Sequence, residues 1–205
     1  MAELEADPVY QAEMQELERQ REEHFAKIRE DAEPLVADLR AAGWEVEFVW
    51  DFVMYPGDYS SAYPILVEHL KRPYMERTRD GIARALTVPD AFQIAWEAVR
   101  DEFLANTDTK TTGFKYALGN ALAQLMDEPV IPEVLDMVTD KRHGRNRAPM
   151  IEILVEYRDR DDVRQVLEAL AEDPEVAKEA KHALALRRVR RRPGRKKQRK
   201  KSRKR

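Results

Sequence analysis

Residues 173–184, DPEVAKEAKHAL, align without gaps with three earlier stretches of the chain. These stretches are MERTRDGIARAL at 75–86, TTGFKYALGNAL at 111–122 and HGRNRAPMIEIL at 143–154. All four end in a leucine, and the leucines are spaced 36, 32 and 30 residues apart. A small or apolar residue lies one helical turn earlier in each: Ile82, Leu118, Met150 and Ala180. A period of ~30–40 residues is typical of stacked helical repeats.

Each aligned stretch falls in the second helix of a predicted helix pair. The apolar and turn patterns predict first helices at 62–72, 89–105, 130–140 and 161–171, and second helices at 75–87, 112–126, 145–157 and 174–190. One pair cannot bury its apolar face alone, so stacked neighbours must form the core. The sequence predicts an all-α protein, an alpha-solenoid of about four helix pairs over residues 62–190. The alternative is an ordinary helical bundle with coincidental spacing.

The last unit also carries a family resemblance. Residues 173–184 open with Asp-Pro and close with Ala-Leu, and they resemble the HEAT-like repeat of the phycobilisome-lyase type. In that pattern Asp-Pro opens the second helix, and small residues and leucines face the next pair. Met75, Thr111 and His143 replace the aspartate in the earlier units. The resemblance covers roughly residues 62–188 and implies a scaffold or binding platform, without implying lyase activity.

Residues 1–61 are expected to cap the first pair. Residues 8–42 have a helical apolar stripe that drifts from a strict heptad, which favours a helix docked on its own protein over a long coiled coil. Pro34 is predicted to divide this helix, and Gly43 to end its second part. The apolar residues of the stripe are Met14, Leu17, Phe25, Ile28, Leu35 and Leu39.

Residues 44–63 hold seven of the sixteen aromatic residues. Alternation over 46–54 suits a strand, but a lone strand is unstable, so a short helix is favoured there. Trp44, Trp50, Tyr55 and Tyr59 are a candidate partner patch, because tryptophan and tyrosine are frequent interface hot spots. The favoured alternative is that they form the core that seals the first pair against the N-terminal helix.

The chain shows no catalytic pattern. Its four histidines, at 24, 69, 143 and 182, have no metal-ligand spacing, and there is no cysteine. The seven glycines form neither a phosphate-binding loop nor a nucleophile elbow. We therefore expect no enzyme activity, no metal and no cofactor.

One loop, residues 141–147, places cations at a helix start. The helix dipole disfavours such charges by ~0.3–1 kcal/mol each. Arg142, His143, Arg145 and Arg147 are therefore a candidate site for an anion or a partner carboxylate. In the favoured alternative these side chains reach acidic neighbours. Those neighbours are Glu133, Asp136 and Asp140.

Residues 187–205, RRVRRRPGRKKQRKKSRKR, form a basic tail with fourteen Lys or Arg and no acidic residue. The remaining 22 Lys plus Arg face all 39 Asp plus Glu, so residues 1–186 carry a formal charge of −17. Residues 191–205 are expected to be disordered. The predicted nucleic-acid-binding residues are Arg187, Arg188, Arg190, Arg191, Arg192, Arg195, Lys196, Lys197, Arg199, Lys200, Lys201, Arg203, Lys204 and Arg205.

Three roles for the tail compete. It can bind nucleic acid or ribonucleoprotein through phosphates, which we favour. It can be a receptor-read address, such as a nuclear localisation signal in a eukaryote. It can also contact acidic lipid or mask its own acidic body, although no second signal for stable membrane anchoring is evident. No apolar run approaches the ~18 residues of a spanning helix and no signal peptide is evident, so we expect a soluble, cytoplasmic protein.

These patterns predict a non-enzymatic adaptor that holds a protein partner on its helical repeats and nucleic acid on its tail. One alternative is a nucleic-acid enzyme such as a DNA alkylation-repair glycosylase, some of which use HEAT-like repeats. The charge of −17 argues against that class, because its groove should be basic. The other alternative is a purely protein-binding scaffold whose tail is a targeting signal or a mask.

Overall fold

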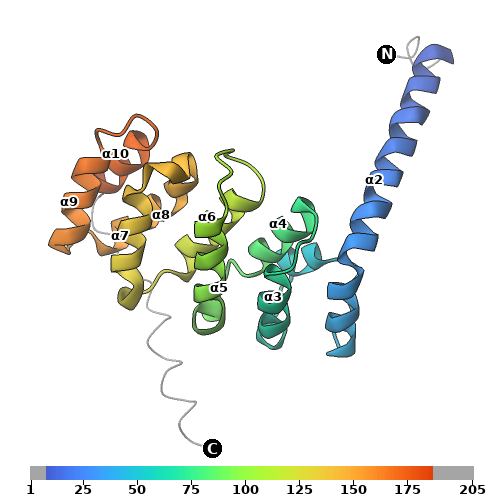
Figure 1. Cartoon of the computed structure of the whole chain (residues 1–205), viewed down its shortest axis with the longest axis horizontal. Helices are drawn as coiled ribbons and strands as arrows, with labels where there is room; N and C mark the ends of the chain where they lie inside the picture. The colour runs from blue at the N-terminus through green and yellow to red at the C-terminus, as the bar shows by residue number, and fades with distance from the viewer. Residues whose placement is uncertain (1–7, 187–205) are drawn as a thin grey trace, which may run out of the picture. The chain divides into compact units, whose positions relative to one another are not determined.

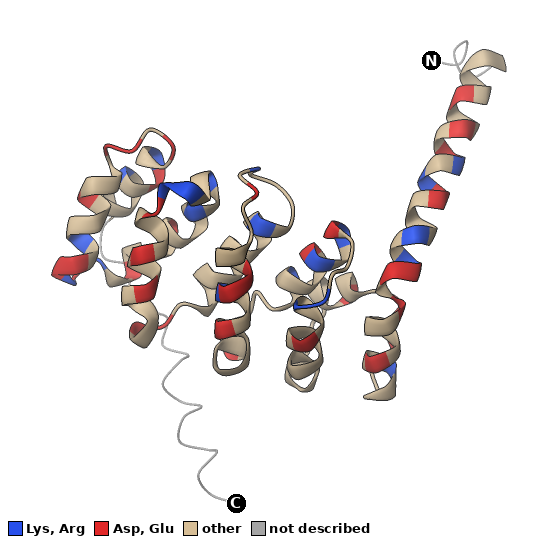
Figure 2. Cartoon of the chain, viewed as in Figure 1, with Lys and Arg blue, Asp and Glu red and all other residues tan. Residues whose placement is uncertain are grey.

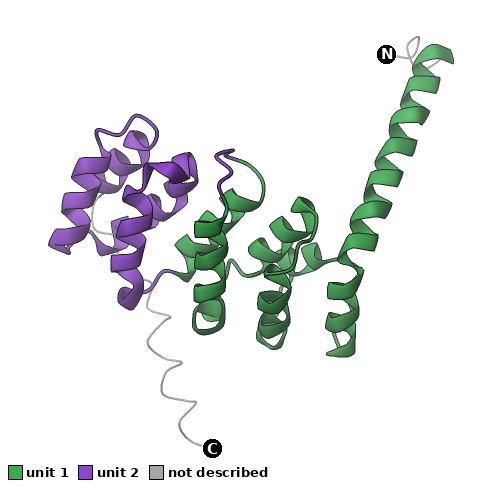
Figure 3. Cartoon of the chain, viewed as in Figure 1, with its two compact units in different colours: residues 1–106, 112–125 green, residues 107–111, 126–205 purple. Residues whose placement is uncertain are grey.

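The computed structural model describes residues 8–186, and every regular element in this range is a helix (Figure 1). The expected all-α class is therefore confirmed. The chain divides into two compact units (Figure 3). Unit 1 comprises residues 1–106 and 112–125, and unit 2 comprises residues 107–111 and 126–205. The predicted disorder of residues 191–205 concerns a segment outside the described residues.

In unit 1 the helices form two stacks. The first helices of two pairs, α3 and α5, pack against each other, and so do the second helices, α4 and α6. Within the pairs, α3 contacts α4 and α5 contacts α6. The elements of this unit are α2 (Pro8–Ala41), η1 (Val49–Met54), η2 (Ser60–Ala62), α3 (Tyr63–Leu70), α4 (Glu76–Ala85), η3 (Pro89–Ala91), α5 (Phe92–Ala105) and α6 (Phe114–Leu125).

Unit 2 repeats this arrangement. Here α7 packs against α9, α8 packs against α10, and the paired helices contact each other as well. The turn between α7 and α8 is itself a short 3-10 helix. The elements are η4 (Glu128–Val130), α7 (Ile131–Thr139), η5 (Lys141–Arg147), α8 (Ala148–Ile153), η6 (Leu154–Tyr157), α9 (Asp161–Leu170) and α10 (Ala177–Ala185).

The aligned apolar positions lie in the cores of the two units, except Leu184, which is partly exposed. Leu86 and Leu122 are completely buried in unit 1, and Leu154 is completely buried in unit 2. The residues one turn earlier are also fully buried in all four stretches: Ile82, Leu118, Met150 and Ala180. The repeat alignment thus identified the inward faces of the second helices.

The N-terminal helix differs from the prediction in two ways. It is one helix of 34 residues, and Pro34 lies inside it rather than dividing it. Pro34 faces solvent, so the carbonyl of Glu30, which loses its intrahelical donor, can bond water instead. Docking is also limited to the second half of α2, because every residue from 8 to 27 is exposed. The buried residues are Ile28, Ala32, Leu35, Val36 and Leu39.

The aromatic segment forms the short helix that was favoured over a strand, as the 3-10 helix η1. This helix approaches α4 closely at Gly81. A Cβ atom at Gly81 would lie 2.6 Å from Cγ1 of Val49 and 2.7 Å from Nε1 of Trp50. Because real Cβ atoms do not approach that closely, this contact requires glycine.

Carboxylates from neighbouring helices cap the second helices of unit 1. The carboxylate of Asp31, on α2, accepts a hydrogen bond from the backbone N–H of Met75 at 2.9 Å and from the hydroxyl of Thr78 at 2.7 Å. Met75 is the N-cap of α4. The carboxylate of Glu76, in α4, accepts from the backbone N–H of Phe114 at the start of α6, at 3.4 Å. The Asp-Pro start that is absent from these units is therefore replaced by carboxylate acceptors from an earlier helix, α2 for α4 and α4 for α6.

We expect Asp31→Ala to lower the free energy of unfolding by about 1–2 kcal/mol, because it removes the capping acceptor of α4. Urea denaturation followed by circular dichroism measures this loss. Glu33→Ala is the matched control, since Glu33 is an exposed carboxylate on the same helix, and it should change stability by less than about 0.5 kcal/mol. Equal effects of the two substitutions would contradict the capping role.

Candidate functional site

The cationic loop of residues 141–147 is built around a buried arginine in unit 2. Arg147 is completely buried, and its guanidinium donates to four acceptors. Nε donates to the carbonyl of Gly144 at 2.8 Å, and Nη1 donates to the carbonyl of Val138 at 3.0 Å. Nη2 donates to the carboxylates of Asp173 at 3.0 Å and Glu175 at 3.3 Å. The cation therefore ties the end of α7 to the segment that leads into α10.

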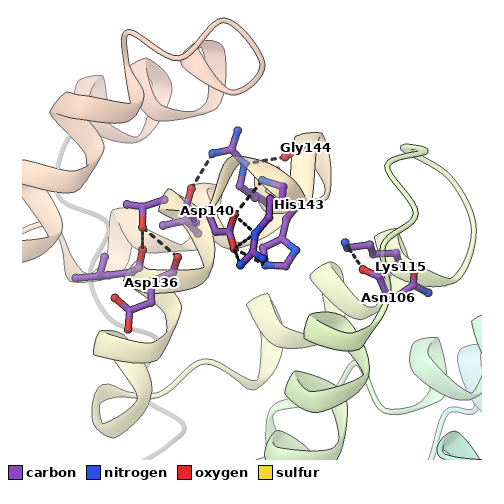
Figure 4. A network of polar contacts seen from close by, with 11 residues as sticks. Asn106, Lys115, Asp136, Asp140, His143 and Gly144 are labelled. Carbon is purple, nitrogen blue, oxygen red and sulfur yellow. Dashed lines mark hydrogen bonds and ion pairs between the residues drawn. The ribbon is translucent and has the colours of Figure 1, made fainter.

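The other three residues of the candidate anion site also have acidic partners. Nε and Nη2 of Arg142 donate to Oδ1 and Oδ2 of Asp140 at 3.0 and 2.7 Å, and this arginine holds the pKa of Asp140 well below its usual range. Nη2 of Arg145 donates to the carboxylate of Glu179 at 2.7 Å. The imidazole Nε2 of His143 lies 3.7 Å from the carboxylate of Asp140 (Figure 4).

The structure thus brings together all four residues of the candidate anion site, but with internal partners. Of the acidic neighbours expected from the sequence, Asp140 pairs with Arg142. Arg145 and Arg147 pair instead with carboxylates that lie 26 to 34 residues further along the chain. Arg147 has no solvent-exposed surface, so it acts within the core of unit 2. Of the three arginines of the candidate site, Arg142 and Arg145 present charge to solvent.

A glycine shapes the loop. Gly144 has φ 54° and ψ −143°, a backbone conformation that residues with a side chain rarely adopt. The helical backbone geometry is interrupted at this residue, so η5 contains a kink between His143 and Arg145. This kink separates the exposed Arg142 from the buried Arg147.

The aspartate of the Asp-Pro motif has two roles. Its Oδ1 accepts from the backbone N–H of Glu175 at 3.1 Å, which closes the turn before α10, and its Oδ2 pairs with Arg147. Burial alone would raise the pKa of Asp173, but the Glu175 N–H and the Arg147 guanidinium outweigh it and lower that pKa. The Asp173 carboxylate is therefore stabilised in its charged form.

The aromatic residues proposed as a partner patch are split into two groups. Trp44, Tyr55 and Tyr59 surround Phe52, with ring centroids 5.1 to 6.1 Å from its ring. Tyr59 is buried, and its hydroxyl donates to the carbonyl of Ala85 at 2.9 Å. These contacts agree with the alternative that the segment seals the first helix pair. Tyr55 remains 43% exposed.

Trp50 forms a separate cluster with α4. The guanidinium carbon of Arg77 lies 3.7 Å from the centroid of the Trp50 ring, within cation–π range, and that of Arg84 lies 5.7 Å away. Both arginines pair with the buried carboxylate of Asp80, at 3.7 and 3.0 Å. Sequence reasoning missed this cluster, although the i, i+3 and i, i+4 spacing of the three charges was a usable signal.

Two further buried polar side chains of unit 1 are hydrogen-bonded. His69 is completely buried, and its Nε2 lies 2.8 Å from the carboxylate of Asp38, while its Nδ1 lies 2.6 Å from the hydroxyl of Tyr74. This contact joins α3 to α2. The ammonium group of Lys115 donates to the carbonyl of Asn106 (Figure 4). Both side chains therefore have structural partners.

All fourteen basic residues of the tail lie outside the described residues. Within residues 8–186, no group of three or more His, Cys, Asp or Glu side chains is arranged to hold a metal ion. In the same range, no helix combines the length and the apolar character needed to cross a membrane.

Replacing Arg147 by Met should lower the free energy of unfolding by about 3–5 kcal/mol, because it leaves the buried carboxylate of Asp173 without its cation. Chemical denaturation monitored by circular dichroism measures the change. Arg142→Met is the matched control, since the Arg142 side chain is 88% exposed. It should lower the free energy of unfolding far less than Arg147→Met does, because solvent screens the exposed pair with Asp140. A loss of similar size in both variants would show that burial of the cation is unimportant.

The lowered pKa of Asp173 predicts a specific pH dependence. A carboxyl whose pKa is lower in the folded chain stabilises that state above its unfolded pKa of about 4, and this contribution is lost as the pH falls through the folded value. The difference in stability between wild type and Asp173→Asn should therefore be full at pH 7 and shrink below about pH 4. Urea midpoints at pH 7, 5, 4 and 3 test this, and a difference independent of pH would contradict it.

The comparisons with known proteins add no family to this geometry. No protein-family model, no curated protein and no solved structure matches the chain. The resemblance of residues 173–184 to HEAT-like repeats therefore rests on the sequence pattern itself.

Proposed function

We propose that this chain is a non-enzymatic HEAT-like repeat adaptor. Its helix pairs hold a protein partner, and its basic tail of residues 187–205 binds nucleic acid or ribonucleoprotein through phosphates, independently of sequence. Four helix pairs, α3/α4, α5/α6, α7/α8 and α9/α10, would form one continuous solenoid. Support for the repeat comes from the stacking of first helices on first helices and of second helices on second helices within each unit.

The observation that carries the proposal is the division of charge. The described residues contain 22 Lys plus Arg and 36 Asp plus Glu, and both signs are interspersed on their helices (Figure 2). The tail concentrates fourteen cations in nineteen residues. An acidic body repels phosphates, so attraction to a polyanion must come from the tail. Because the tail has no aromatic residue, it offers no aromatic platform for base stacking, and its charges should attract phosphates without selecting a sequence.

The proposed protein contact of the helical body is the exposed edge of the aromatic segment. Val53, Met54 and Tyr55 are 38%, 86% and 43% exposed, although they adjoin the buried Phe52. Exposed apolar side chains beside a well-packed anchor are typical of interaction surfaces. The seal formed by Trp44, Phe52 and Tyr59 would hold this edge rigid.

Fluorescence anisotropy with labelled duplex DNA and structured RNA, across a salt series, tests the tail. The full chain should bind both, and about six phosphate contacts to duplex DNA give a slope of log affinity against log salt near −5. A chain that stops after Arg188 keeps every described residue and should bind neither. A full chain with Gln at 195–197 and 199–201 keeps eight of the fourteen cations, so it should bind more weakly than the wild-type chain and show a shallower slope.

A tail with the order of residues 189–205 scrambled is the matched control, and it should bind like wild type. Strong discrimination between the scrambled and native tails would contradict sequence-independent attraction. Binding by the chain that stops after Arg188 would instead place the nucleic-acid surface on the helices, as in a nucleic-acid enzyme.

A further inference from the structure

The first half of α2 is a helix without a covering neighbour in the described structure. Every residue from 8 to 27 is exposed, although the same helix is buried from Ile28 to Leu39 on one face. Figure 1 shows α2 continuing well beyond α3 and α4 of its own unit. At 1.5 Å per residue, the exposed part is about 30 Å long.

The exposed half continues the apolar face that the second half buries. Three turns of helix take 10.8 residues, so side chains eleven positions apart lie on nearly the same line. Leu17 precedes the buried Ile28 by eleven residues, and Phe25 precedes the buried Val36 by eleven. Met14 precedes Phe25 by the same interval. Met14, Leu17 and Phe25 are about half exposed, so this face lacks a partner in unit 1.

A charged residue lies in the middle of this face. Arg21 precedes the buried Ala32 by eleven residues, and Glu18 lies at the edge of the face one turn before it. Arg19, which lies away from this face, pairs within its own helix with Glu16 and Glu23. By contrast, neither Arg21 nor Glu18 has an ion pair within residues 8–186. Covering this face would require a carboxylate opposite Arg21.

We propose that this face, the α2 stripe of Tyr10, Met14, Leu17, Arg21 and Phe25, binds the α2 stripe of a second copy in antiparallel orientation. One antiparallel register pairs the side chains of the two stripes. In this register residue i lies at the same height along the helix axis as residue 39 − i of the other copy. Met14 then faces Phe25, and Glu18 faces Arg21. The two-fold axis repeats both contacts, so the stripe is complementary to itself. A parallel, in-register pair would instead place Arg21 against Arg21.

The size of this contact fits a reversible dimer. The overlap of residues 10–29 is a single helix-on-helix interface, with a buried area on the order of 1,000 Å², near the lower limit for specific complexes. Each charge pair joins Arg21 in the middle of the stripe to Glu18 at its edge, and such pairs set register and partner choice more than strength. Association should therefore depend on protein concentration.

Reversing the charge at either position of the Glu18–Arg21 pair tests the pairing. Sedimentation equilibrium of the full, nuclease-treated chain measures the dissociation constant of each variant. Arg21→Glu alone creates two Glu–Glu contacts per dimer, and Glu18→Arg alone creates two Arg–Arg contacts. Each should raise the dissociation constant at least about tenfold. An equimolar mixture of the two variants should regain dimers, because each mixed dimer again has two opposite-charge contacts. An ion pair within one helix cannot produce this recovery.

Lys27→Glu is the matched control for charge. It makes the same change as Arg21→Glu on an exposed residue away from the stripe, and it should leave the dissociation constant unchanged. If Lys27→Glu and Arg21→Glu weaken association equally, net charge explains the effect and the proposed register is wrong.

Cross-linking tests the antiparallel register, and the absence of native cysteine makes it specific. A mixture of Met14→Cys and Phe25→Cys chains should form a disulfide-linked heterodimer under mild oxidation, since these positions face each other. Each variant alone should cross-link poorly, because its two cysteines would lie about 16 Å apart along the helix axis. Residues 12 and 27 also lie at the same height in this register, but on the side of the helix away from the stripe. A mixture of Ala12→Cys and Lys27→Cys chains should therefore form no disulfide.

A chain that stays monomeric at all concentrations would overturn the proposal and leave the stripe for a helix of another protein. Efficient cross-linking of Met14→Cys with itself would also overturn it, because that requires another register. The result is separable from the nucleic-acid proposal, because these variants keep the whole basic tail.

Discussion

The backbone N–H groups at the start of a helix have no partner within that helix, and this chain satisfies several of them with carboxylates from a neighbouring segment. The carboxylate of Asp31 accepts a hydrogen bond from the backbone at the start of α4, and the carboxylate of Glu76 accepts one at the start of α6. The α-helices from Tyr63 to Ala185 have 6 to 14 residues, a length at which isolated helices are marginal. Each capping contact therefore adds to the apolar packing that holds a second helix against an earlier helix, α4 against α2 and α6 against α4.

The sequence was sufficient to locate the helix pairs because their signals are local. The repeated leucines and the residues one turn before them identified the buried faces, as the complete burial of Leu86, Leu122 and Leu154 shows. The division of α2 at Pro34 was predicted wrongly, because the cost of a proline depends on whether the freed carbonyl meets water. Tertiary packing on the opposite face of α2 keeps the helix continuous, and a local rule contains no information about that packing.

The candidate site shows the limit of sequence reasoning more sharply. The cations of residues 141–147 break the dipole rule for a helix start, and this departure correctly marked the loop as unusual. Its explanation lay 26 residues away in Asp173, which no local pattern connects to Arg147. Asp173 of the Asp-Pro motif and Arg147 of the basic loop are the two partners of one buried ion pair. The unfavourable position of these cations at a helix start is therefore compensated by a long-range ion pair. Such compensation is expected in natural sequences, in which local structure and the overall fold stabilise each other.

The position of Asp31 gives α2 a sharp internal boundary. Before Ile28 the helix contributes no buried side chain to unit 1. From Ile28 onward it packs into the core of unit 1, and Asp31 caps the start of α4. The first half can therefore lengthen, shorten or change its composition during evolution without disturbing the fold behind it. Selection on folding therefore acts on the second half of this continuous helix and leaves the first half open to change for other purposes.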